Sequence, residues 1–236
     1  MSFLKAEWRK LAIANYAVDD DLLRPYLPYK TELDKWNNTT YVSLVAFRFL
    51  NTRILGVKVP FHINFEEVNL RFYVLFKEAD EWKRGVVFVR EIVPKRAITF
   101  VANRVYKENY RTLPTSHKWI ENDDHLHIRY GWKINGTLQE VALKTDKVSL
   151  PIPIGSEEEF ITEHYWGYAQ INDSKTHEYE VTHPRWQHYP VIEHELNANF
   201  GLLYGDRFGQ LSQQTPTSVM LAEGSEITVE KKRVIQ

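Results

Sequence analysis

The chain of 236 residues contains no cysteine, which excludes disulfide bonds, thiol catalysis and cysteine-bound metals. It also lacks an excess of either charge, because its formal net charge is -1 at pH 7, so we expect no nucleic-acid partner. No apolar run approaches the roughly 20 residues of a membrane-spanning helix, and residues 1–8 show no signal-peptide core. These absences predict a cytoplasmic protein without a membrane partner.

Several well-known catalytic motifs are missing too. The sequence has no Gly-x-Ser-x-Gly elbow, no phosphate-binding loop and no glycine pattern for a dinucleotide. Aromatic residues, in contrast, make up 14% of the chain. That content suits a sheet-rich core or a cavity lined by rings.

Alternating apolar residues predict a fold built largely of strands. The clearest strand covers residues 64–76, where Glu66 lies on an apolar face and Glu67 shares the other face with Asn69 and Arg71. The other predicted strands are residues 11–18, 41–50, 84–93, 125–134, 139–143, 165–171, 177–182, 218–222 and 226–230.

Helices are predicted to be few and short. Apolar residues recur with helical spacing over 98–105, and Ser156 followed by three glutamates predicts an N-cap and a helix to about residue 163. Residues 151–155, with two prolines and a glycine, are the best candidate linker. The pattern predicts an α+β fold dominated by strands.

Lys95 and Arg96 stand where the strand over 84–93 ends and the helical pattern begins. If Pro94 is the first helical residue, both cations lie in the first turn, where the helix dipole opposes positive charge by roughly 0.3–1 kcal/mol. This field and the permanent charge of Arg96 favour a neutral Lys95 amine, the form that attacks a carbonyl. Both effects are small, so activation also needs desolvation, and a solvated corner is the alternative interpretation.

Glu66 and Glu67 are candidates for proton transfer. Adjacent strand residues point to opposite faces, so only one of the two can face a cavity. Glu67, on the polar face, fits a pocket, whereas Glu66 would need a partner to be buried on its apolar face. A structural role at an edge or turn is the alternative for each.

Other residues suggest weaker hypotheses. His125 and His127 share one strand face, which suits a metal, but no third ligand follows at a recognised spacing and we assign no metal site. Trp166, Tyr168 and Trp186 belong to aromatic clusters that fit a core or the wall of a ligand pocket.

Several longer stretches match one family pattern. These are residues 6–9, 31–34, 64–71, 90–94, 160–168 and 180–186. Through them the chain resembles, nearly end to end, the bacterial YqjF-like family, which looks like a member of the acetoacetate decarboxylase-like superfamily. The resemblance implies an antiparallel, barrel-like α+β fold around a central cavity, with residues 1–236 as one domain whose halves would meet near residues 151–155.

The resemblance also implies roles for individual residues. Lys95 matches the lysine that forms a Schiff base in the decarboxylases, and Arg96 stands in place of a second lysine beside it. Glu67 matches a glutamate that opens a strand, and Arg9 with Tyr16 matches an arginine and a tyrosine of the first strand. The interval from Glu91 to Pro94 is two residues shorter here than in the decarboxylases.

The resulting hypothesis is a cofactor-independent Schiff-base enzyme, a lyase that acts on a small keto acid. Lys95 would attack the carbonyl, Arg96 would favour the free amine and Glu67 would move protons. The expected substrate-binding residues are Arg9, Glu66, Arg71, Trp166 and Tyr168. The alternative is a non-catalytic small-molecule-binding module of the same fold, and a homo-oligomer is compatible with both.

Overall fold

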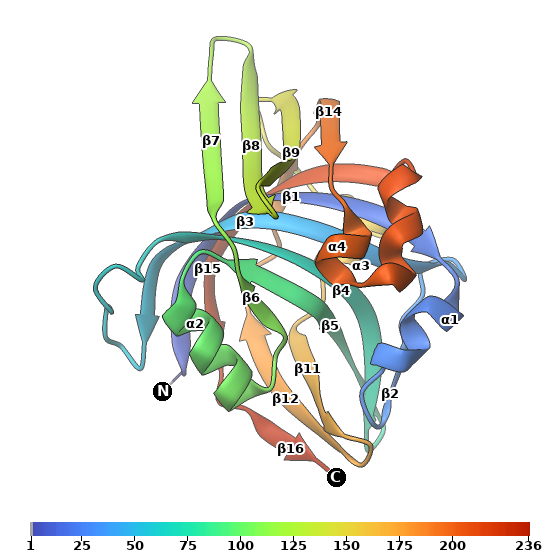
Figure 1. Ribbon diagram of the computed structural model, residues 1–236. Helices are drawn as coiled ribbons and strands as arrows, with labels where there is room; N and C mark the ends of the chain where they lie inside the picture. The colour runs from blue at the N-terminus through green and yellow to red at the C-terminus, as the bar shows by residue number, and fades with distance from the viewer. Residues whose placement is uncertain (1) are drawn as a thin grey trace.

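The computed structural model describes residues 2–236, and strands form most of its regular structure (Figure 1). The larger of two sheets has twelve strands: β1 (Leu4–Val18), β2 (Thr31–Leu33), β3 (Thr40–Ile54), β4 (Phe65–Glu78), β5 (Glu81–Val93), β6 (Tyr110–Thr112), β10 (Leu150–Pro151), β11 (Trp166–Asn172), β12 (Lys175–Thr182), β13 (Gln187–Tyr189), β15 (Ser218–Val229) and β16 (Arg233–Ile235). The smaller sheet runs in the order β14 (Val191–Asn197), β9 (Thr137–Asp146), β8 (His125–Ile134) and β7 (Thr115–Glu121).

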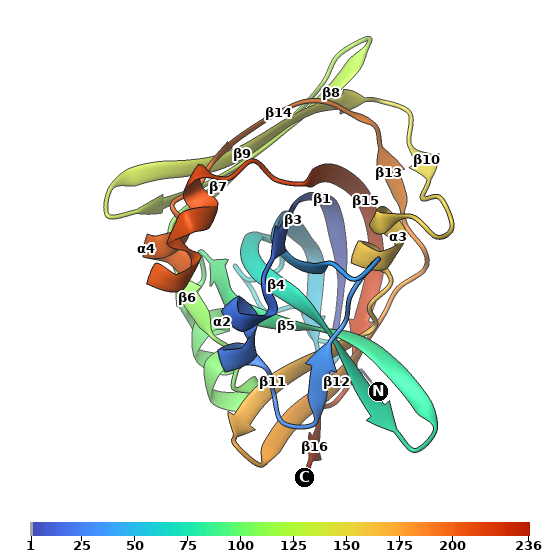
Figure 2. The same ribbon diagram turned by 90° about the vertical axis from the view of Figure 1, so that its right-hand side faces the viewer.

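The helices are short and lie at strand ends, as the sequence predicted (Figure 2). They are α1 (Asp20–Leu23), α2 (Arg96–Val101), α3 (Glu157–Thr162) and α4 (Phe200–Tyr204), with 3-10 segments η1 (Arg24–Tyr26) and η3 (Asp206–Gln213) and a π-helical segment η2 (Ala102–Tyr106). No helix of the described part is long and apolar enough to cross a bilayer.

The α+β, strand-dominated class is confirmed, but the large sheet is mixed instead of purely antiparallel. Strand β5 pairs in parallel with β6 and with β11, while its partner β4 is antiparallel. A parallel pair needs a long crossover connection, and α2 and most of the small sheet lie in the chain between β5 and β11. Strand β12 pairs with β11, β15 and β16, so a run from β15 through β1, β3, β4, β5, β11 and β12 returns to β15.

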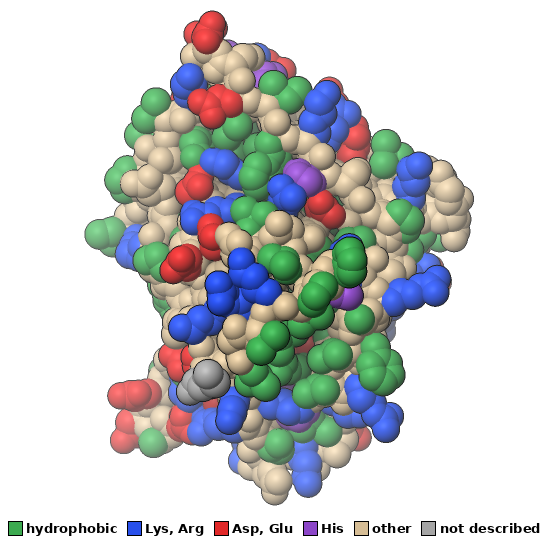
Figure 3. Space-filling view, turned by 90° about the vertical axis from the view of Figure 1, so that its left-hand side faces the viewer, with side chains coloured by type: hydrophobic (Ala, Val, Ile, Leu, Met, Phe, Trp, Pro, Cys, Tyr) green, Lys and Arg blue, Asp and Glu red, His purple; other side chains and the backbone are tan. Residues whose placement is uncertain are grey.

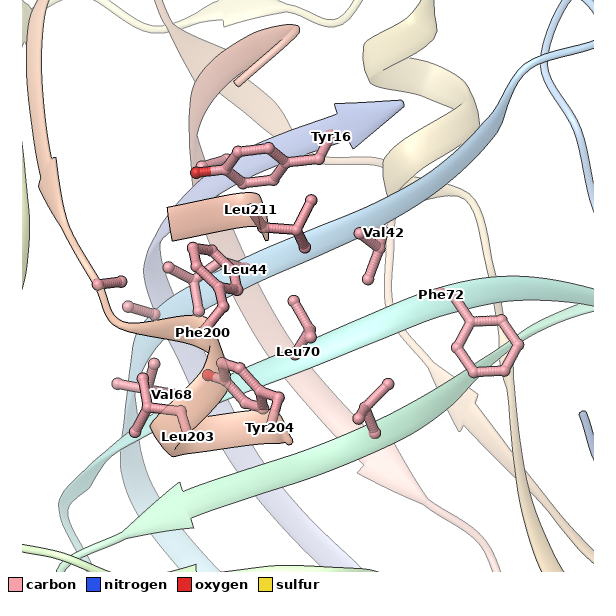
Figure 4. Packing of buried hydrophobic residues seen from close by; sticks show 14 of the residues in the cluster. Tyr16, Val42, Leu44, Val68, Leu70, Phe72, Phe200, Leu203, Tyr204 and Leu211 are labelled. Carbon is pink, nitrogen blue, oxygen red and sulfur yellow. The ribbon is translucent and has the colours of Figure 1, made fainter. Parts of the chain in front are cut away.

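Strand β4 separates two cores, as its alternation predicts. Val68, Leu70 and Phe72 pack beneath Phe200 and other residues of α4 and η3 on one face (Figure 4). Phe65 and Tyr73 of the same strand belong to the second core on the opposite face. Glu67, Asn69 and Arg71, which alternate with the first-core residues, therefore lie on the side of the second core.

Local turn chemistry follows the sequence closely. Asn135 and Gly136 both have positive φ, 50° and 79°, as a tight hairpin turn between β8 and β9 requires. The Ser156 hydroxyl accepts a hydrogen bond of 3.1 Å from the Glu159 backbone and caps α3. The candidate linker, residues 151–155, connects β10 to α3, and strands from both sides of it join the large sheet.

Candidate active-site cavity

A cavity of about 290 Å³ lies against the second core, on the Glu67 side of β4. Much of its wall is aromatic and includes Trp8, Phe47, Phe49, Phe65, Phe88 and Trp166. Val59, in the β3–β4 connection, and Val101, in α2, line the cavity and are also exposed at the surface. The cavity therefore opens between these two segments, on a face where hydrophobic side chains gather (Figure 3).

Glu67 is the carboxyl group that the sequence predicted for this cavity, and it is 3% exposed. Its two oxygens accept hydrogen bonds from Asn69 Nδ2 at 3.0 Å and from the Tyr110 hydroxyl at 3.2 Å. Burial raises the pKa of Glu67 to about 7, although these two donors and the charge of Arg71 oppose the rise. Glu67 is therefore suited to exchange protons near neutral pH.

Glu91 reaches the same cavity because β5 is irregular. Strict alternation would place Glu91 with Val87 and Val89, which face the first core. A register shift occurs where β5 passes Leu70 and Arg71 of β4, and after it Glu91 pairs with Asn69 and lines the cavity. Burial raises the pKa of Glu91 well above its usual range, and the charges of Glu108 and Glu67 add to the effect.

Glu108 enters from a loop. Lys107 ends the π-helical segment with a left-handed φ of 63°, and the chain then turns so that Glu108 lines the cavity. The Tyr179 hydroxyl donates to Glu108 Oε1 at 2.9 Å. Burial, followed by the charge of Glu67, raises the pKa of Glu108 to about 8.

Gly167 on β11 makes room for this contact. A Cβ atom at residue 167 would lie 2.2 Å from Cζ of Tyr179, so any side chain there would displace the Tyr179 ring. Burial and neighbouring carboxylates raise the pKa values of Tyr110 and Tyr179 well above their usual range. Both hydroxyls therefore stay protonated and act as donors.

Several buried polar atoms of the wall have no hydrogen-bond partner among the residues that the structure describes. They are Trp8 Nε1, Thr52 Oγ1, Asn69 Oδ1, Arg71 Nε, Glu91 Oε2 and His164 Nδ1. Buried polar groups are normally paired, so these atoms are available to a ligand or to water.

His164 forms another part of the wall and is oriented from behind. Its Nε2 lies 3.0 Å from Asp34 Oδ2, and Arg84 Nε donates to the same oxygen at 2.8 Å. Burial lowers the pKa of His164 to about 4, so its imidazole is neutral at pH 7. The pKa of Asp34 is lowered because these two hydrogen bonds outweigh its own burial.

Only some of the residues predicted from the sequence meet in the cavity. Glu67, Arg71, Trp166 and Trp186 line it. Arg71 is buried and donates to the Ile161 carbonyl at 3.1 Å.

The predicted nucleophile and its neighbour lie elsewhere. Lys95 is half-buried at the N-cap of α2, outside the cavity lining found in residues 2–236, and Arg96 is exposed. Arg9 also lies outside that lining, since its guanidinium contacts Glu7 at 2.8 Å and Glu223 at 3.6 Å. The three charged groups of the sequence hypothesis, Lys95, Glu67 and Arg9, are thus not brought together.

Two further expected ligand-binding residues face other surroundings. Glu66 points away from the cavity and bonds Thr115 at 2.8 Å and His117 at 2.5 Å. Tyr168 belongs to the first core and donates to Glu178 at 3.1 Å. The period-2 alternation of a strand explains both positions, because Glu67 and Gly167, their neighbours in sequence, line the cavity instead.

The histidines considered for a metal, His125 and His127, lie on β8 of the small sheet. Within residues 2–236 no group of three or more His, Asp or Glu side chains is placed to hold a metal ion.

Comparisons with known proteins match a family and a fold. The family described as uncharacterized conserved protein, DUF2071, matches residues 5–226. The uncharacterized protein YqjF of Bacillus subtilis is 33% identical over 86 residues, which span 36% of this chain and 34% of that relative.

Solved structures resemble almost the whole chain. Acetoacetate decarboxylase from Legionella pneumophila has a TM-score of 0.66 at 13% identity, covering 99% of this chain and 87% of its own. The enduracididine biosynthesis enzyme MppR with bound HEPES has a TM-score of 0.70 at 13% identity, covering 100% and 89%. MppR complexed with pyruvate has a TM-score of 0.67 at 12% identity, covering 100% and 91%. At these identities the likeness shows an acetoacetate decarboxylase-like fold.

Proposed function

The chain belongs to the DUF2071 family of uncharacterized conserved proteins, and we propose that it binds a small carbonyl compound and moves a proton at the adjacent carbon. The observation that carries this proposal is Glu67, a buried carboxyl group inside an apolar cavity that also holds Arg71. An acid–base group and a fixed cation in a site shielded from water are the parts that such chemistry needs.

The proposed step is reversible and needs no co-reactant. The Glu67 carboxylate takes a proton from the carbon next to the carbonyl, the C–H electron pair forms a carbon–carbon double bond, and the carbonyl oxygen becomes an enolate oxygen. Arg71, whose Nε has no partner among the described residues, supplies N–H donors for that oxygen. Return of a proton from Glu67 to carbon regenerates the ketone, and a pKa of about 7 suits both directions.

The size of the cavity supports a ligand of modest dimensions. An engineered apolar cavity of about 150 Å³ holds benzene, so about 290 Å³ has room for a ring with a short polar chain. The similar fold of MppR with bound pyruvate supports a 2-oxo acid as the first compound to test.

Deuterium exchange tests the proposal directly. Pyruvate is incubated with the protein in D₂O, and loss of the methyl signal is followed by proton NMR. We expect exchange above the uncatalysed rate, lost in Glu67→Gln and retained in the matched variant Glu66→Gln, whose carboxyl group faces the other way. Exchange that is equal in Glu67→Gln and the unmodified protein refutes the role of Glu67. Absence of exchange with pyruvate and with 2-oxo-4-phenylbutanoate, despite binding, leaves the non-catalytic binding module as the function.

The Schiff-base enzyme is the second candidate, and one observation favours it. Lys95 directly precedes α2, whose Ala97 and Ile98 line the cavity, so its backbone lies close to the cavity wall. Its amine would condense with the carbonyl and release water, and borohydride would reduce the imine to a stable amine. Treatment with pyruvate and borohydride, followed by peptide mapping, should then show an adduct at Lys95 that is absent in Lys95→Ala. An unmodified Lys95 removes this candidate and leaves the Glu67 chemistry intact.

We also infer that the large sheet is barrel-like and that residues 1–236 form one domain. The return of the strand run to β15 through β12 supports the first inference. The pairing of β11 and β12 with strands that precede residues 151–155 or end the chain supports the second.

A further inference from the structure

The polar floor of the cavity is formed by Glu67, Glu91 and Glu108 with the hydroxyls of Tyr110 and Tyr179. The carboxyl oxygens of this floor outnumber the tyrosine hydroxyls that can donate hydrogen bonds to them. Both tyrosine protons are already used, because Tyr110 donates to Glu67 at 3.2 Å and Tyr179 donates to Glu108 at 2.9 Å. The tyrosine donors of the floor are therefore used, and the donors that remain are the protons of the carboxyl groups themselves, each of which becomes a pure acceptor when it loses its proton to bind a cation.

Two of the remaining acceptors lie side by side. Glu91 Oε2 and Asn69 Oδ1 have no hydrogen-bond partner among the described residues, although Glu91 is only 3% exposed and Asn69 only 2%. The two residues are register partners on β5 and β4, so their side chains leave the sheet on the same face. Asn69 is an amide outside the carboxyl cluster, and its buried, unpaired oxygen independently indicates a ligand with N–H or O–H donors.

Tyrosine rings line the same cavity as this acceptor pair. Tyr110 is the register partner of Glu91, and Tyr106 packs edge-on against Tyr179 with ring centroids 5.7 Å apart. Ring faces attract cations, and an ammonium group combines that attraction with three donors and no acceptor. A neutral alcohol or ketone would leave more of the acceptors unpaired.

We propose that the ligand carries a protonated nitrogen, an ammonium or related N–H cation, which binds between Glu91 and Asn69 on the carboxyl floor. This inference rests on the proposed function and names the substrate class of the same cavity: a small organic cation that also bears an apolar body. The carbonyl end of such a ligand would point toward Arg71, whose free Nε lies along the same face of β4.

The charged groups that line the cavity predict that its carboxyl groups release protons when a cation binds. The lining contains three carboxyl groups and one permanent cation, Arg71, with the hydroxyls of Tyr110 and Tyr179 and the imidazoles of His62, His164 and His183. Burial lowers the pKa of His164 and of His183, so neither supplies a full positive charge at pH 7. Because burial raises the pKa values of all three carboxyl groups, the floor holds protons at pH 7 that a bound cation would displace.

Calorimetry with three probes of matched shape tests the inference. The probes are 2-phenylethylammonium, the neutral 2-phenylethanol and the anionic 3-phenylpropionate, titrated at pH 7 into the unmodified chain in two buffers of different ionisation enthalpy. We expect the ammonium ion to bind at least about tenfold more tightly than the alcohol, as a charge-assisted hydrogen bond provides. Its apparent enthalpy should depend on the buffer because protons are released, whereas that of the alcohol should not.

The Glu91→Gln variant localises the effect, and Glu66→Gln is its control. Glu91→Gln should reduce the preference for the ammonium ion about tenfold while binding the alcohol as before, and Glu66→Gln should keep the full preference. Thermal unfolding of each variant checks that it is folded. If the alcohol or the anion binds and the ammonium ion binds no more tightly, the inference is overturned while the proposed small-molecule cavity stands. If none of the three binds, the inference fails, and the proposed function is decided separately by the pyruvate exchange experiment.

Discussion

Replacement of Glu67 by glutamine is expected to change how stability depends on pH. Burial raises the pKa of Glu67 from 4.5 to about 7 in the folded chain. At 1.36 kcal/mol per pKa unit, ionising Glu67 costs the folded state about 3 kcal/mol more than the unfolded state. Glutamine has nearly the same shape and no charge to desolvate, so the variant avoids this cost.

The sign follows from the direction of the pKa change. Below pH 4.5 the carboxyl group is protonated in both states, and Glu67 imposes no ionisation cost. Between pH 4.5 and about 7 the folded chain keeps a proton that the unfolded chain loses, so stability falls as pH rises. Above about pH 8 the full cost is present, and Glu67→Gln should exceed the unmodified chain by about 3 kcal/mol more than it does at pH 4.5.

The neighbouring residue supplies a control of opposite sign. Glu66 is also shielded, but Thr115, its own backbone and His117 outweigh its burial and lower its pKa. Glu66 therefore stabilises the folded chain above pH 4.5, and this contribution is lost as pH falls through its lowered pKa. Glu66→Gln should thus be less stable than the unmodified chain at pH 7 and recover toward it in acid.

Urea denaturation of the three proteins at pH 4.5, 7 and 9, with a further measurement at about pH 3 for Glu66→Gln and the unmodified chain, measures these differences as free energies of unfolding. Parallel pH profiles for the unmodified chain and Glu67→Gln would falsify the assignment of Glu67 as a buried carboxyl group with a pKa of about 7. The same result would remove the basis for its role as a base near neutral pH.

Three further substitutions test other parts of the structure. Gly167→Ala should destabilise the fold by about 1–3 kcal/mol and weaken ligand binding, because the added Cβ would lie 2.2 Å from the Tyr179 ring. Gly209→Ala is the control, since its added Cβ would have only a 4.0 Å contact and should change the thermal unfolding temperature little. Asp34→Asn should cost about 1–3 kcal/mol in urea denaturation, since it weakens the acceptor shared by an arginine and a buried histidine. Phe200→Ala should cost about 3–5 kcal/mol, because its fully buried ring holds α4 against the large sheet.

Much of the local structure could be predicted from the sequence. The alternation in β4 assigned Glu67 to a polar face that proved to line the cavity, and Asn135 with Gly136 marked a hairpin. Ser156 followed by acidic residues marked the start of α3. These features depend on neighbours in the chain, which is why simple periodicity and turn chemistry found them.

The rest of the floor depends on features with no local signal. Glu91 faces the cavity because of a register shift, Glu108 because Lys107 adopts a left-handed conformation, and Tyr179 because Gly167 on the adjacent strand leaves room for its ring. Gly167 lies in an aromatic stretch of the sequence and could have indicated this contact, since a glycine within a strand often marks a site where another chain segment approaches closely. The parallel pairing of β5 with β11 also depends on a long crossover that no strand pattern reveals.

Because of the register shift in β5, one extra residue in that strand decides which side chain, and so which charge, faces the cavity floor. Arg90 and Glu91 are consecutive, and at present Arg90 bonds the Leu203 carbonyl on the far side of the sheet while Glu91 faces the cavity. If β5 ran past β4 without this irregularity, Val89 would pair with Leu70 and Arg90 with Asn69, which would put a guanidinium where a carboxyl group now lies. The extra residue that β5 accommodates opposite Leu70 and Arg71 therefore determines whether the cavity floor presents a carboxyl group or a guanidinium.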